Sequence, residues 1–338
     1  MSFHIVNIDT PQCSLTCKDG QLIRRAPGEP DRTLPLEDVA SIIITSFSAS
    51  IHSSLFLEAA KHGVALIICE AFKPVSLVLP ANRSTDTLLS RALLKLDAKA
   101  TARLWQATVD AKCRNQCVLA ERIAPGDPAW PLLRATAFGK KPHKEGICAK
   151  LFWQIFGRAL GDEEFSRDRG SGGLNALLNY GYAVLLSTVL QKLFGMGLDP
   201  TFGISHVPRE RSTPLAYDLM EPFRPCVDWR VAQWALGRRQ AEPSGARQPA
   251  EGNPPGASGG GQQCGGMKTS GPGERWEVTR EFRQWVTGFP LEKVEYLDLE
   301  LNVQSCIEGV VRGFRRAVLH GDLKRYRPWT PKNSKWAG

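Results

Sequence analysis

Residues 206–228 read HVPRERSTPLAYDLMEPFRPCVD, and the other segments of the chain are interpreted around this stretch. It contains one histidine, His206, and two of its carboxylates, Asp218 and Glu221, lie three positions apart. On a helix this spacing puts both carboxylates on one face, one turn from each other. Imidazole and carboxylate ligands with open positions suit a divalent cation that acts on phosphate oxygens. The alternative is a surface turn with two solvated acids and a histidine bonded to a backbone carbonyl.

Four residues predict the bounds of a short helix in this stretch. Ser212 or Thr213 can cap its N-terminus, and Pro214 suits the first turn. Pro222 should end or kink the helix directly after Glu221. Both carboxylates are therefore expected in a last turn, beside a bend in the chain.

Length and charge define the broad class of the protein. A chain of 338 residues suggests two domains, or one large domain with an insert. Its apolar fraction of 42% is ample for a core, and its charged fraction of 23% is ordinary for a soluble protein. The formal net charge of +9 favours a polyanionic partner, although charge alone does not separate nucleic acid from a membrane surface.

The sequence predicts neither secretion nor a membrane span. Its first residues, MSFHIVNID, lack a basic segment followed by an apolar block. The most apolar region, residues 174–198, is interrupted by polar residues, so a buried helix is expected there. The nine cysteines are scattered and lack zinc-site spacing, which favours buried reduced thiols over a metal site. Such thiols indicate a reducing compartment, most simply the cytoplasm.

Residues 1–83 predict a small β-rich domain. The dipeptide Asp19-Gly20 between apolar runs is a strong hairpin signal. Residues 52–62 have a helical pattern that ends at Gly63, a natural helix C-terminus. Strands are expected at residues 3–9, 14–25, 40–45, 64–69 and 73–80. This half contains no catalytic cluster, so its histidines are interpreted as structural.

From residue 84 the apolar period changes from two to 3.6, which predicts a helical domain over residues 84–239. Helices are expected at residues 85–123 (one or two helices), 144–160, 174–195 and 229–239. Asp228 can cap the last of these helices. Residues 124–143 are rich in Pro and Gly and are expected to form a loop.

Three features of this helical domain are candidates for function. Basic residues recur every four positions at Arg91, Lys95, Lys99 and Arg103. They form either a row that binds DNA phosphates or an ordinary solvated helix face. Glu145 lies in the first turn of its predicted helix, where a carboxylate also complements the helix dipole. Asn179 and Tyr180 lie in the apolar helix 174–195, and buried amides and phenols need partners. A polar site beside that helix is therefore expected.

The C-terminal third contains an insert and a basic end. Fifteen of the thirty-six residues at 240–275 are Gly or Pro, and none is Leu, Ile, Val, Phe, Tyr or Trp, which predicts a flexible insert. Order is expected to resume in residues 276–338, with a long helix over 299–320. The last 28 residues hold eight Lys or Arg and one acid, with Trp329 and Trp336 among them. This pattern indicates nucleic-acid binding, or else a merely solubilising tail.

Taken together, these segments resemble the CRISPR-associated endonuclease family that serves as the integrase subunit in spacer acquisition, in the form found in type II systems. The resemblance covers essentially the whole chain. Besides Glu145 at a helix start, it rests on TLPLEDVASIII (33–44), GVALIIC (63–69), PVSLVLP (74–80), LNALLNYGYAVL (174–185), LDPTFGISH (198–206) and LAYDLMEPFRPCVD (215–228).

The resemblance implies a fold and a metal site. The fold is α+β, with a small N-terminal β-rich domain followed by a larger all-α catalytic domain. The implied ligands of Mg²⁺ or Mn²⁺ are Glu145, His206 and Glu221, with Asp218 as a nearby second acid. Asn179 and Tyr180 are candidates for supporting these ligands.

The resemblance also implies a reaction and partners. The protein is expected to insert short DNA fragments into a CRISPR array by attack of a 3′-OH on repeat-end phosphodiesters; with water as nucleophile, the same site is a nuclease. The implied partners are double-stranded DNA, a second copy of the chain in a homodimer, and a small CRISPR-associated subunit that bridges two dimers, in the cytoplasm of a prokaryote. A membrane is not expected as a partner.

Two departures from the family pattern concern DNA contacts and the insert. Where many relatives have a His-His or Asn-rich segment, this chain has Ser205 and PRERSTP, so Arg209 and Arg211 are candidate DNA contacts together with Arg224. The insert at 240–275 is longer than the family needs. Two other functions stay open: a non-catalytic scaffold that bridges DNA, and a repair nuclease that acts on branched DNA.

Overall fold

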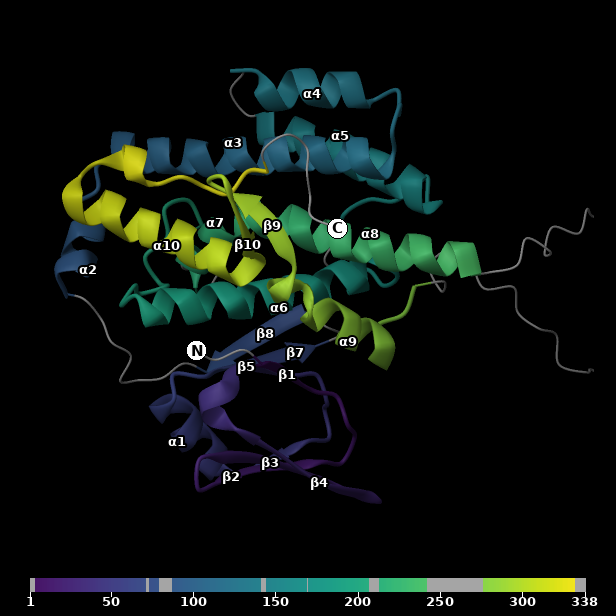
Figure 1. Ribbon diagram of the computed structural model, residues 1–338, viewed down its shortest axis with the longest axis vertical. Helices are drawn as coiled ribbons and strands as arrows, with labels where there is room; N and C mark the ends of the chain where they lie inside the picture. The colour runs from purple at the N-terminus through teal and green to yellow at the C-terminus, as the bar shows by residue number, and fades with distance from the viewer. Residues whose placement is uncertain are drawn as a thin grey trace, which may run out of the picture.

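The protein consists of a β-rich part and a helical part that share one sheet. The structure, a computed structural model, describes residues 4–70, 73–78, 87–140, 144–168, 170–206, 213–241 and 276–331. The strands of the first part lie at one end of the molecule and most helices at the other (Figure 1). This arrangement confirms the predicted α+β fold.

The N-terminal part contains two four-stranded sheets. Their elements are β1 (His4–Ile8), β2 (Ser14–Lys18), β3 (Gln21–Ala26), β4 (Glu29–Pro35), β5 (Val39–Ile44), β6 (Ser50–Ile51), β7 (Ala65–Glu70) and β8 (Lys73–Val78), with helix α1 (Ser53–Lys61) between β6 and β7. One sheet has the order β1-β5-β7-β8 and the other the order β4-β3-β2-β6. Strands β1, β5 and β7 run parallel, whereas β2, β3 and β4 are antiparallel neighbours.

Strand β5 joins the two parts because its side chains alternate between two cores. Ile42 and Ile44 belong to the core between the two sheets, whereas Ile43 belongs to the core of the helical part. Successive side chains of a strand point to opposite faces, so this sheet is buried on both sides. Helix α6 (Leu174–Gly195) covers its outer face by packing on β5, β7 and β8 (Figure 1).

Two local predictions in the N-terminal part are confirmed. Asp19 and Gly20 both have positive φ, 52° and 71°, which a two-residue hairpin turn between β2 and β3 requires. Helix α1 begins after His52, whose side chain accepts a hydrogen bond from Ser54 N, and the chain leaves it through Gly63 at φ 68°.

The helical part surrounds α6, of which 18 of 22 residues are buried. Gly181 allows α8 to approach, because a Cβ there would lie 2.5 Å from Cγ1 of Val227. The surrounding helices are α2 (Thr87–Leu94), α3 (Ala98–Ile123), α4 (Trp130–Phe138), α5 (Lys144–Leu160), α7 (Pro214–Met220), α8 (Arg224–Ala241), α9 (Arg280–Thr287) and α10 (Val303–His320). They are accompanied by the hairpin of β9 (Lys293–Tyr296) and β10 (Leu299–Asn302) and by the 3₁₀ turns Leu36–Asp38, Glu221–Phe223, Phe289–Leu291 and Leu323–Arg325.

Two predictions for this part were wrong. The expected loop at 124–143 contains helix α4, because Pro131 occupies a first-turn position where proline is tolerated. The predicted helix over 299–320 begins only at Val303, because residues 299–302 form β10. Leu297 and Asp298 make the hairpin turn with φ of 50° and 68°. Leucine rarely adopts a positive φ, so the sequence does not predict a turn there.

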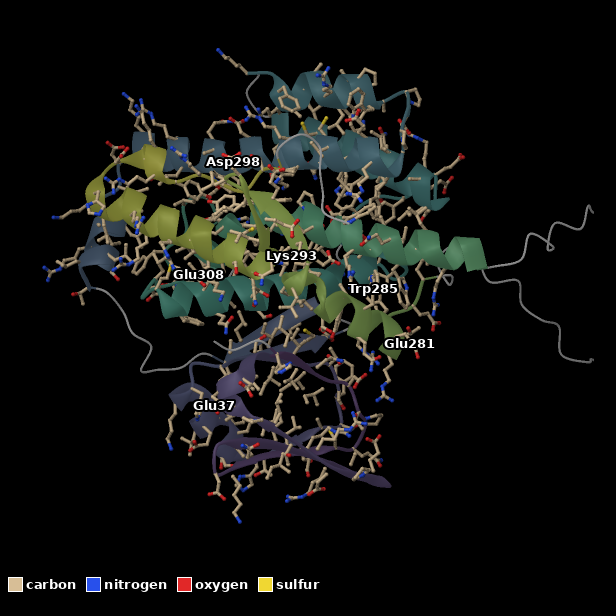
Figure 2. The ribbon with its side chains drawn as sticks, in the orientation of Figure 1. Glu37, Glu281, Trp285, Lys293, Asp298 and Glu308 are labelled. Atoms are coloured by element: carbon tan, nitrogen blue, oxygen red, sulfur yellow. The ribbon has the colours of Figure 1, made fainter. Side chains whose placement is uncertain are left out.

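The C-terminal elements contact α8 and α6 through side chains that include Trp285 and Glu308, which are labelled in Figure 2. The guanidinium of Arg230 on α8 lies 3.4 Å from the ring centroid of Trp285 on α9, and Trp285 Nε1 donates to Arg230 O at 3.2 Å. Glu308 on α10 pairs with Lys192 on α6, with 3.4 Å between Nζ and Oε2. These contacts close the helical part around α6.

The described cysteines are buried and unbridged, as predicted. Burial raises the pKa of the Cys69 thiol to about 12, so it stays protonated at neutral pH. None of the described helices has the length and apolar character that a membrane crossing requires.

Candidate functional site

The segment that carries the two acids folds as two helices joined by a tight turn. Helix α7 begins at Pro214 after Thr213 and ends at Met220, and Glu221–Phe223 form a 3₁₀ turn before α8. The predicted start and the predicted bend at Pro222 are confirmed. The prediction that Asp228 caps the next helix was wrong, because α8 begins four residues earlier, at Arg224.

Asp218 and Glu221 are both buried, with exposed fractions of 0% and 3%. The alternative of a surface turn with solvated acids is therefore wrong. A buried carboxylate is stable only where hydrogen bonds or opposite charges compensate it. The partners of the two carboxylates differ, and this difference separates their roles.

Asp218 holds the loop that carries His206. Its Oδ2 accepts from the backbone N–H groups of Ile204 and Ser205 at 2.6 and 3.1 Å, and its Oδ1 accepts from His206 N at 3.1 Å. Oδ1 also lies 2.8 Å from Nδ1 of His206. Gly203 allows this close approach, because a Cβ there would lie 3.0 Å from Oδ2 of Asp218.

These four contacts fill the acceptor positions of the Asp218 carboxylate. Since a carboxylate accepts, Nδ1 of the His206 ring carries a proton, and in the neutral ring Nε2 carries the lone pair. The hydrogen bond to Asp218 raises the pKa of His206, against the lowering effect of burial. The imidazole is also bounded by the rings of Trp105 and Tyr217, at centroid distances of 6.0 and 5.9 Å.

Glu145 and Glu221 come together around one lysine that the sequence did not single out. Lys112 of α3 places Nζ 2.7 Å from Oε1 of Glu145 on α5 and 2.6 Å from Oε2 of Glu221. Nε of Arg224 lies 2.9 Å from Oε1 of Glu221. Burial alone would raise the pKa of Glu221, but the charges of Arg224 and Lys112 lower it to about 2.

The donor set fits a hard divalent cation. Two carboxylates from different elements already share one positive charge, and Glu221 is electrostatically coupled to the His206 imidazole. Carboxylate oxygens and a neutral imidazole nitrogen are ligands that Mg²⁺ and Mn²⁺ accept. Across the described residues, however, no three His, Cys, Asp or Glu side chains converge as a ready ligand cluster. Lys112 stands between the two glutamates.

A polar network links α6 to Glu221 through Arg224. The Arg224 guanidinium lies 4.7 Å from the ring centroid of Tyr182, and Tyr182 OH donates to Asp228 Oδ1 at 2.5 Å. Arg167 lies 5.4 Å from the same ring and donates to Asn179 Oδ1 at 2.6 Å. Asn179 is therefore linked to the network around Glu221 through Arg167 and Tyr182.

Tyr180 lies on another face of α6. Its ring packs edge-on against Phe282 of α9, and its hydroxyl is influenced by the charges of Arg283 and Asp9. A role of Tyr180 in supporting the metal ligands stays a prediction. Tyr182, three positions after Asn179, is the phenol that reaches the network.

The C-terminal segment packs behind the turn that carries Glu221. Nδ2 of Asn115 on α3 donates to Pro222 O at 2.7 Å and to Trp329 O at 2.9 Å. The Trp329 ring stacks on Phe223, with 5.7 Å between centroids and 13° between planes. Trp329 is fully buried, so it does not stack on nucleic-acid bases as its place in a basic segment suggested. Trp336 lies outside the described residues.

The other candidate DNA contacts are scattered. Arg91 lies on α2, Lys95 in the following turn, and Lys99 and Arg103 on α3; all four are exposed. Since Asp97 starts a new helix, they do not form one continuous helical stripe. Arg209 and Arg211 lie outside the described residues. Arg224 is committed to Glu221 and Tyr182 and is not a surface contact.

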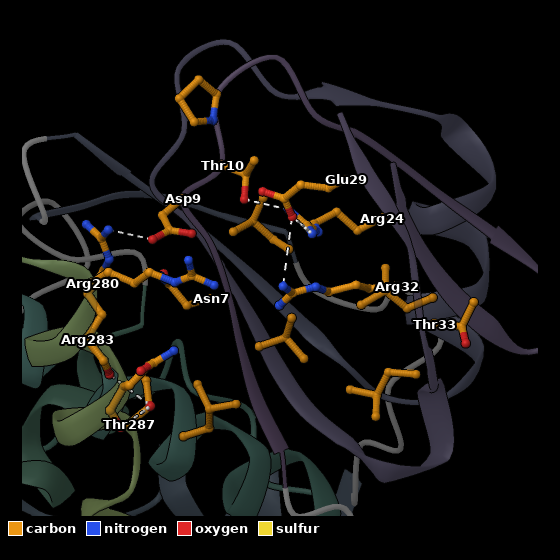
Figure 3. Close-up of a pocket in the computed structure, with 17 residues that line it drawn as sticks. Asn7, Asp9, Thr10, Arg24, Glu29, Arg32, Thr33, Arg280, Arg283 and Thr287 are labelled. Atoms are coloured by element: carbon orange, nitrogen blue, oxygen red, sulfur yellow. Dashed lines mark hydrogen bonds and ion pairs between the residues drawn. The ribbon is translucent and has the colours of Figure 1, made fainter. Parts of the chain in front are cut away.

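A cavity of about 770 Å³ lies elsewhere, between the N-terminal sheets and α9. Four arginines line it, and Figure 3 shows them facing two carboxylates: Arg24 pairs with Glu29, and Arg283 with Asp9, each at 2.5 Å. None of the predicted site residues lines this cavity. The Asp9–Arg283 pair makes it a junction between the two parts of the protein.

Comparison with known proteins bears on the family of the chain. The family model described as CRISPR associated protein Cas1 matches residues 6–252. The chain belongs to the Cas1 family. The CRISPR-associated endonuclease Cas1 of Neisseria meningitidis is 34% identical over 235 residues, which cover 68% of this Cas1 chain and 75% of that protein. The resemblance seen in the sequence is therefore confirmed.

Solved structures show the same Cas1 fold at low identity. A casposase bound to its integration product superposes with a TM-score of 0.69 at 20% identity, covering 100% of this chain and 96% of that one. A chain of a Cas6-RT-Cas1–Cas2 complex superposes with a TM-score of 0.70 at 15% identity, covering 98% of this chain and 36% of that one. At these identities the likeness concerns the fold alone.

Proposed function

We propose that this Cas1 family member is a divalent-metal-dependent DNA endonuclease and integrase that inserts short foreign DNA fragments into a CRISPR array. The observation that carries the proposal is the meeting of Glu145 and Glu221 around one shared positive charge, beside an imidazole oriented by Asp218. Family membership and the endonuclease named among its relatives support the same reaction class.

Glu145, Glu221 and Nε2 of His206 would hold Mg²⁺ or Mn²⁺. The cation, when bound, would neutralise the charge that develops on the phosphate oxygens and help to orient the attacking hydroxyl. The remaining residues prepare the ligands. Asp218 fixes the ring and tautomer of His206, as a carboxylate partner commonly does for a metal-binding histidine. Arg224 keeps the buried Glu221 ionised and in place.

The proposed reaction is a phosphodiester exchange. The 3′ oxygen of the incoming fragment forms a bond to a repeat-end phosphorus while the bond from that phosphorus to the leaving oxygen breaks. The proton of the attacking hydroxyl is lost and the leaving oxygen gains one, so no oxidant or energy donor is consumed. With water as the nucleophile, the same exchange is hydrolysis.

The proposed partners are double-stranded DNA, a second copy of the chain in a homodimer, and a small CRISPR-associated subunit. A net charge of +9 and the exposed cations of α2 and α3 support DNA binding. The Cas1–Cas2 complex among the similar folds supports a second subunit.

A strand-transfer assay tests the proposal. A labelled short duplex is mixed with a plasmid that carries a repeat, with and without Mn²⁺ and the small subunit. We expect covalent joining of the label to the plasmid only with metal, and none with Glu145→Gln or Glu221→Gln. A DNA-bridging scaffold would bind DNA equally in chelator and join nothing. A repair nuclease would cut branched DNA with metal but leave the plasmid unlabelled.

A further inference from the structure

Lys112 is a charged residue in the interior of the helical part. It lies on α3, four positions after Thr108 and three before Asn115, both of which are buried. Its side chain is only 13% exposed. An ammonium group in such a place is stable only when opposite charges compensate it, and Glu145 and Glu221 supply them at 2.7 and 2.6 Å.

The charges of this cluster balance without a metal. Lys112 and Arg224 carry two positive charges, and Glu145 and Glu221 carry two negative ones. Asp218 is satisfied separately by His206 and three backbone N–H groups. A divalent cation that joins the two glutamates therefore adds charge to a cluster that is already neutral. It also competes with Lys112 for Oε1 of Glu145 and Oε2 of Glu221.

We propose that Lys112 is an internal counter-cation of the metal site, which holds the two glutamates together without metal and competes with the metal for their oxygens. The inference rests on the proposed function, because it takes Glu145 and Glu221 as ligands. Its consequence is that metal binding displaces the Lys112 ammonium. The site is thus kept assembled at the cost of weaker metal binding.

Metal binding to the DNA-free protein tests this role without an activity measurement. Mn²⁺ is titrated into wild type and Lys112→Met by calorimetry, and thermal unfolding is followed with and without Mn²⁺. We expect Lys112→Met to unfold at a lower temperature without metal, because the buried carboxylate of Glu221 and the partly exposed carboxylate of Glu145 both lose a partner. We expect Lys112→Met to bind Mn²⁺ at least about tenfold more tightly than wild type. Changes at residues that contact metal ligands typically alter metal affinity on this scale. Its unfolding temperature should therefore rise more on Mn²⁺ addition than that of wild type.

Two variants serve as controls. Lys112→Arg keeps the positive charge and should bind Mn²⁺ no more tightly than wild type. Lys150→Met removes an exposed lysine from α5 and should leave both Mn²⁺ affinity and unfolding temperature unchanged. Together they separate the charge at position 112 from a general loss of positive charge.

A measurement on wild type covers the case in which Lys112→Met does not fold. Lysine acetylation is followed by mass spectrometry with and without Mn²⁺. Displacement of Lys112 should increase its acetylation severalfold, while Lys150 stays constant. Equal labelling of Lys112 with and without Mn²⁺ overturns the inference, as does an unchanged or weaker Mn²⁺ affinity of Lys112→Met. If wild type binds no Mn²⁺ at all, the proposed metal site itself is wrong, which is a different result from the other two.

Discussion

Oδ1 of Asp218 lies 2.8 Å from Nδ1 of His206, and the same carboxylate accepts hydrogen bonds from three consecutive backbone N–H groups at Ile204, Ser205 and His206. One buried acid thereby fixes both the backbone and the ring of the histidine. Asp218 was predicted as a second acid near the metal. Its contacts with His206 and the preceding backbone indicate instead that it orients His206.

Asp218→Asn should reduce strand transfer without abolishing it. The amide offers one acceptor oxygen, and its NH₂ group faces N–H donors, so the ring of His206 loses its fixed orientation. Changes at a partner of a metal ligand typically cost roughly ten- to a hundredfold in metal affinity or activity. The initial rate of strand transfer measures the loss. A rate as low as that of His206→Ala would show that Asp218 itself binds metal.

The His206–Asp218 pair should contribute to stability mainly at low pH. Asp218 raises the pKa of His206 above its usual 6.5. A raised folded-state pKa gives stability that is complete below the unfolded value and is lost as pH rises through the folded value. The difference in free energy of unfolding between wild type and Asp218→Asn should therefore be larger at about pH 5.5 than at about pH 9. Urea unfolding at both pH values measures it, and an equal difference contradicts the expectation.

Glu145→Ala, His206→Ala and Glu221→Ala should each abolish strand transfer while DNA binding is retained. The three variants should differ in stability. Glu221→Ala leaves Lys112 and Arg224 without a buried partner and should lose about 3–5 kcal/mol of unfolding free energy. Glu145 is more exposed and its variant should lose less. Wild-type turnover in any of the three would remove that residue from the site.

Asn115→Ala should loosen the turn that carries Glu221. The amide donates to Pro222 O and Trp329 O, and both carbonyls would be left without this donor in a buried place. We expect a loss of about 2–4 kcal/mol in unfolding free energy, at roughly 1–2 kcal/mol for each bond. Chemical denaturation measures it. Gln106→Ala on the exposed side of α3, where the side chain donates to Asp110, is the matched control and should cost little.

Replacing residues 242–275 with a short Gly/Ser linker should change the melting temperature little. Long loops add little closure entropy, and this segment has no core-forming side chains. The replacement must keep Ala241, where α8 ends, and Trp276, which is buried. A large drop in melting temperature would show that the segment packs against the rest of the protein.

Neutralising Lys95 and Lys99 should weaken binding to all DNA sequences alike. Both are exposed, and neither stretch offers side chains set to read base edges. The log–log slope of affinity against salt should flatten by up to about two units, at about 0.9 per phosphate contact. Titrations at several salt concentrations with two unrelated duplexes test this. An unchanged slope would make these lysines an ordinary solvated surface.

The sequence by itself determined the elements and the family. Local patterns predicted α6 at residues 174–195, the start of α7 at Pro214 and the hairpin turn at Asp19-Gly20. Such predictions succeed because apolar periodicity, proline and glycine affect the backbone within a few residues. Motif blocks identified the family and therefore the expected ligands. Helix α4 and the β9–β10 hairpin were not predicted. The residues around Pro131 and Leu297 carry no local signal for the conformations that these two residues adopt.

Only the tertiary structure decided which charges meet. Lys112 lies 33 residues before Glu145 and 109 before Glu221, so no local pattern couples it to them, and its one signal is a lysine between buried polar positions of α3. Asn115, Tyr182 and Asp228 were missed for the same reason. The sequence does not show which of Tyr180 and Tyr182 reaches the network around Glu221, because the direction of each phenol on a largely buried helix depends on its neighbours. Burial makes such pairings strong, and burial is a property of the assembled fold.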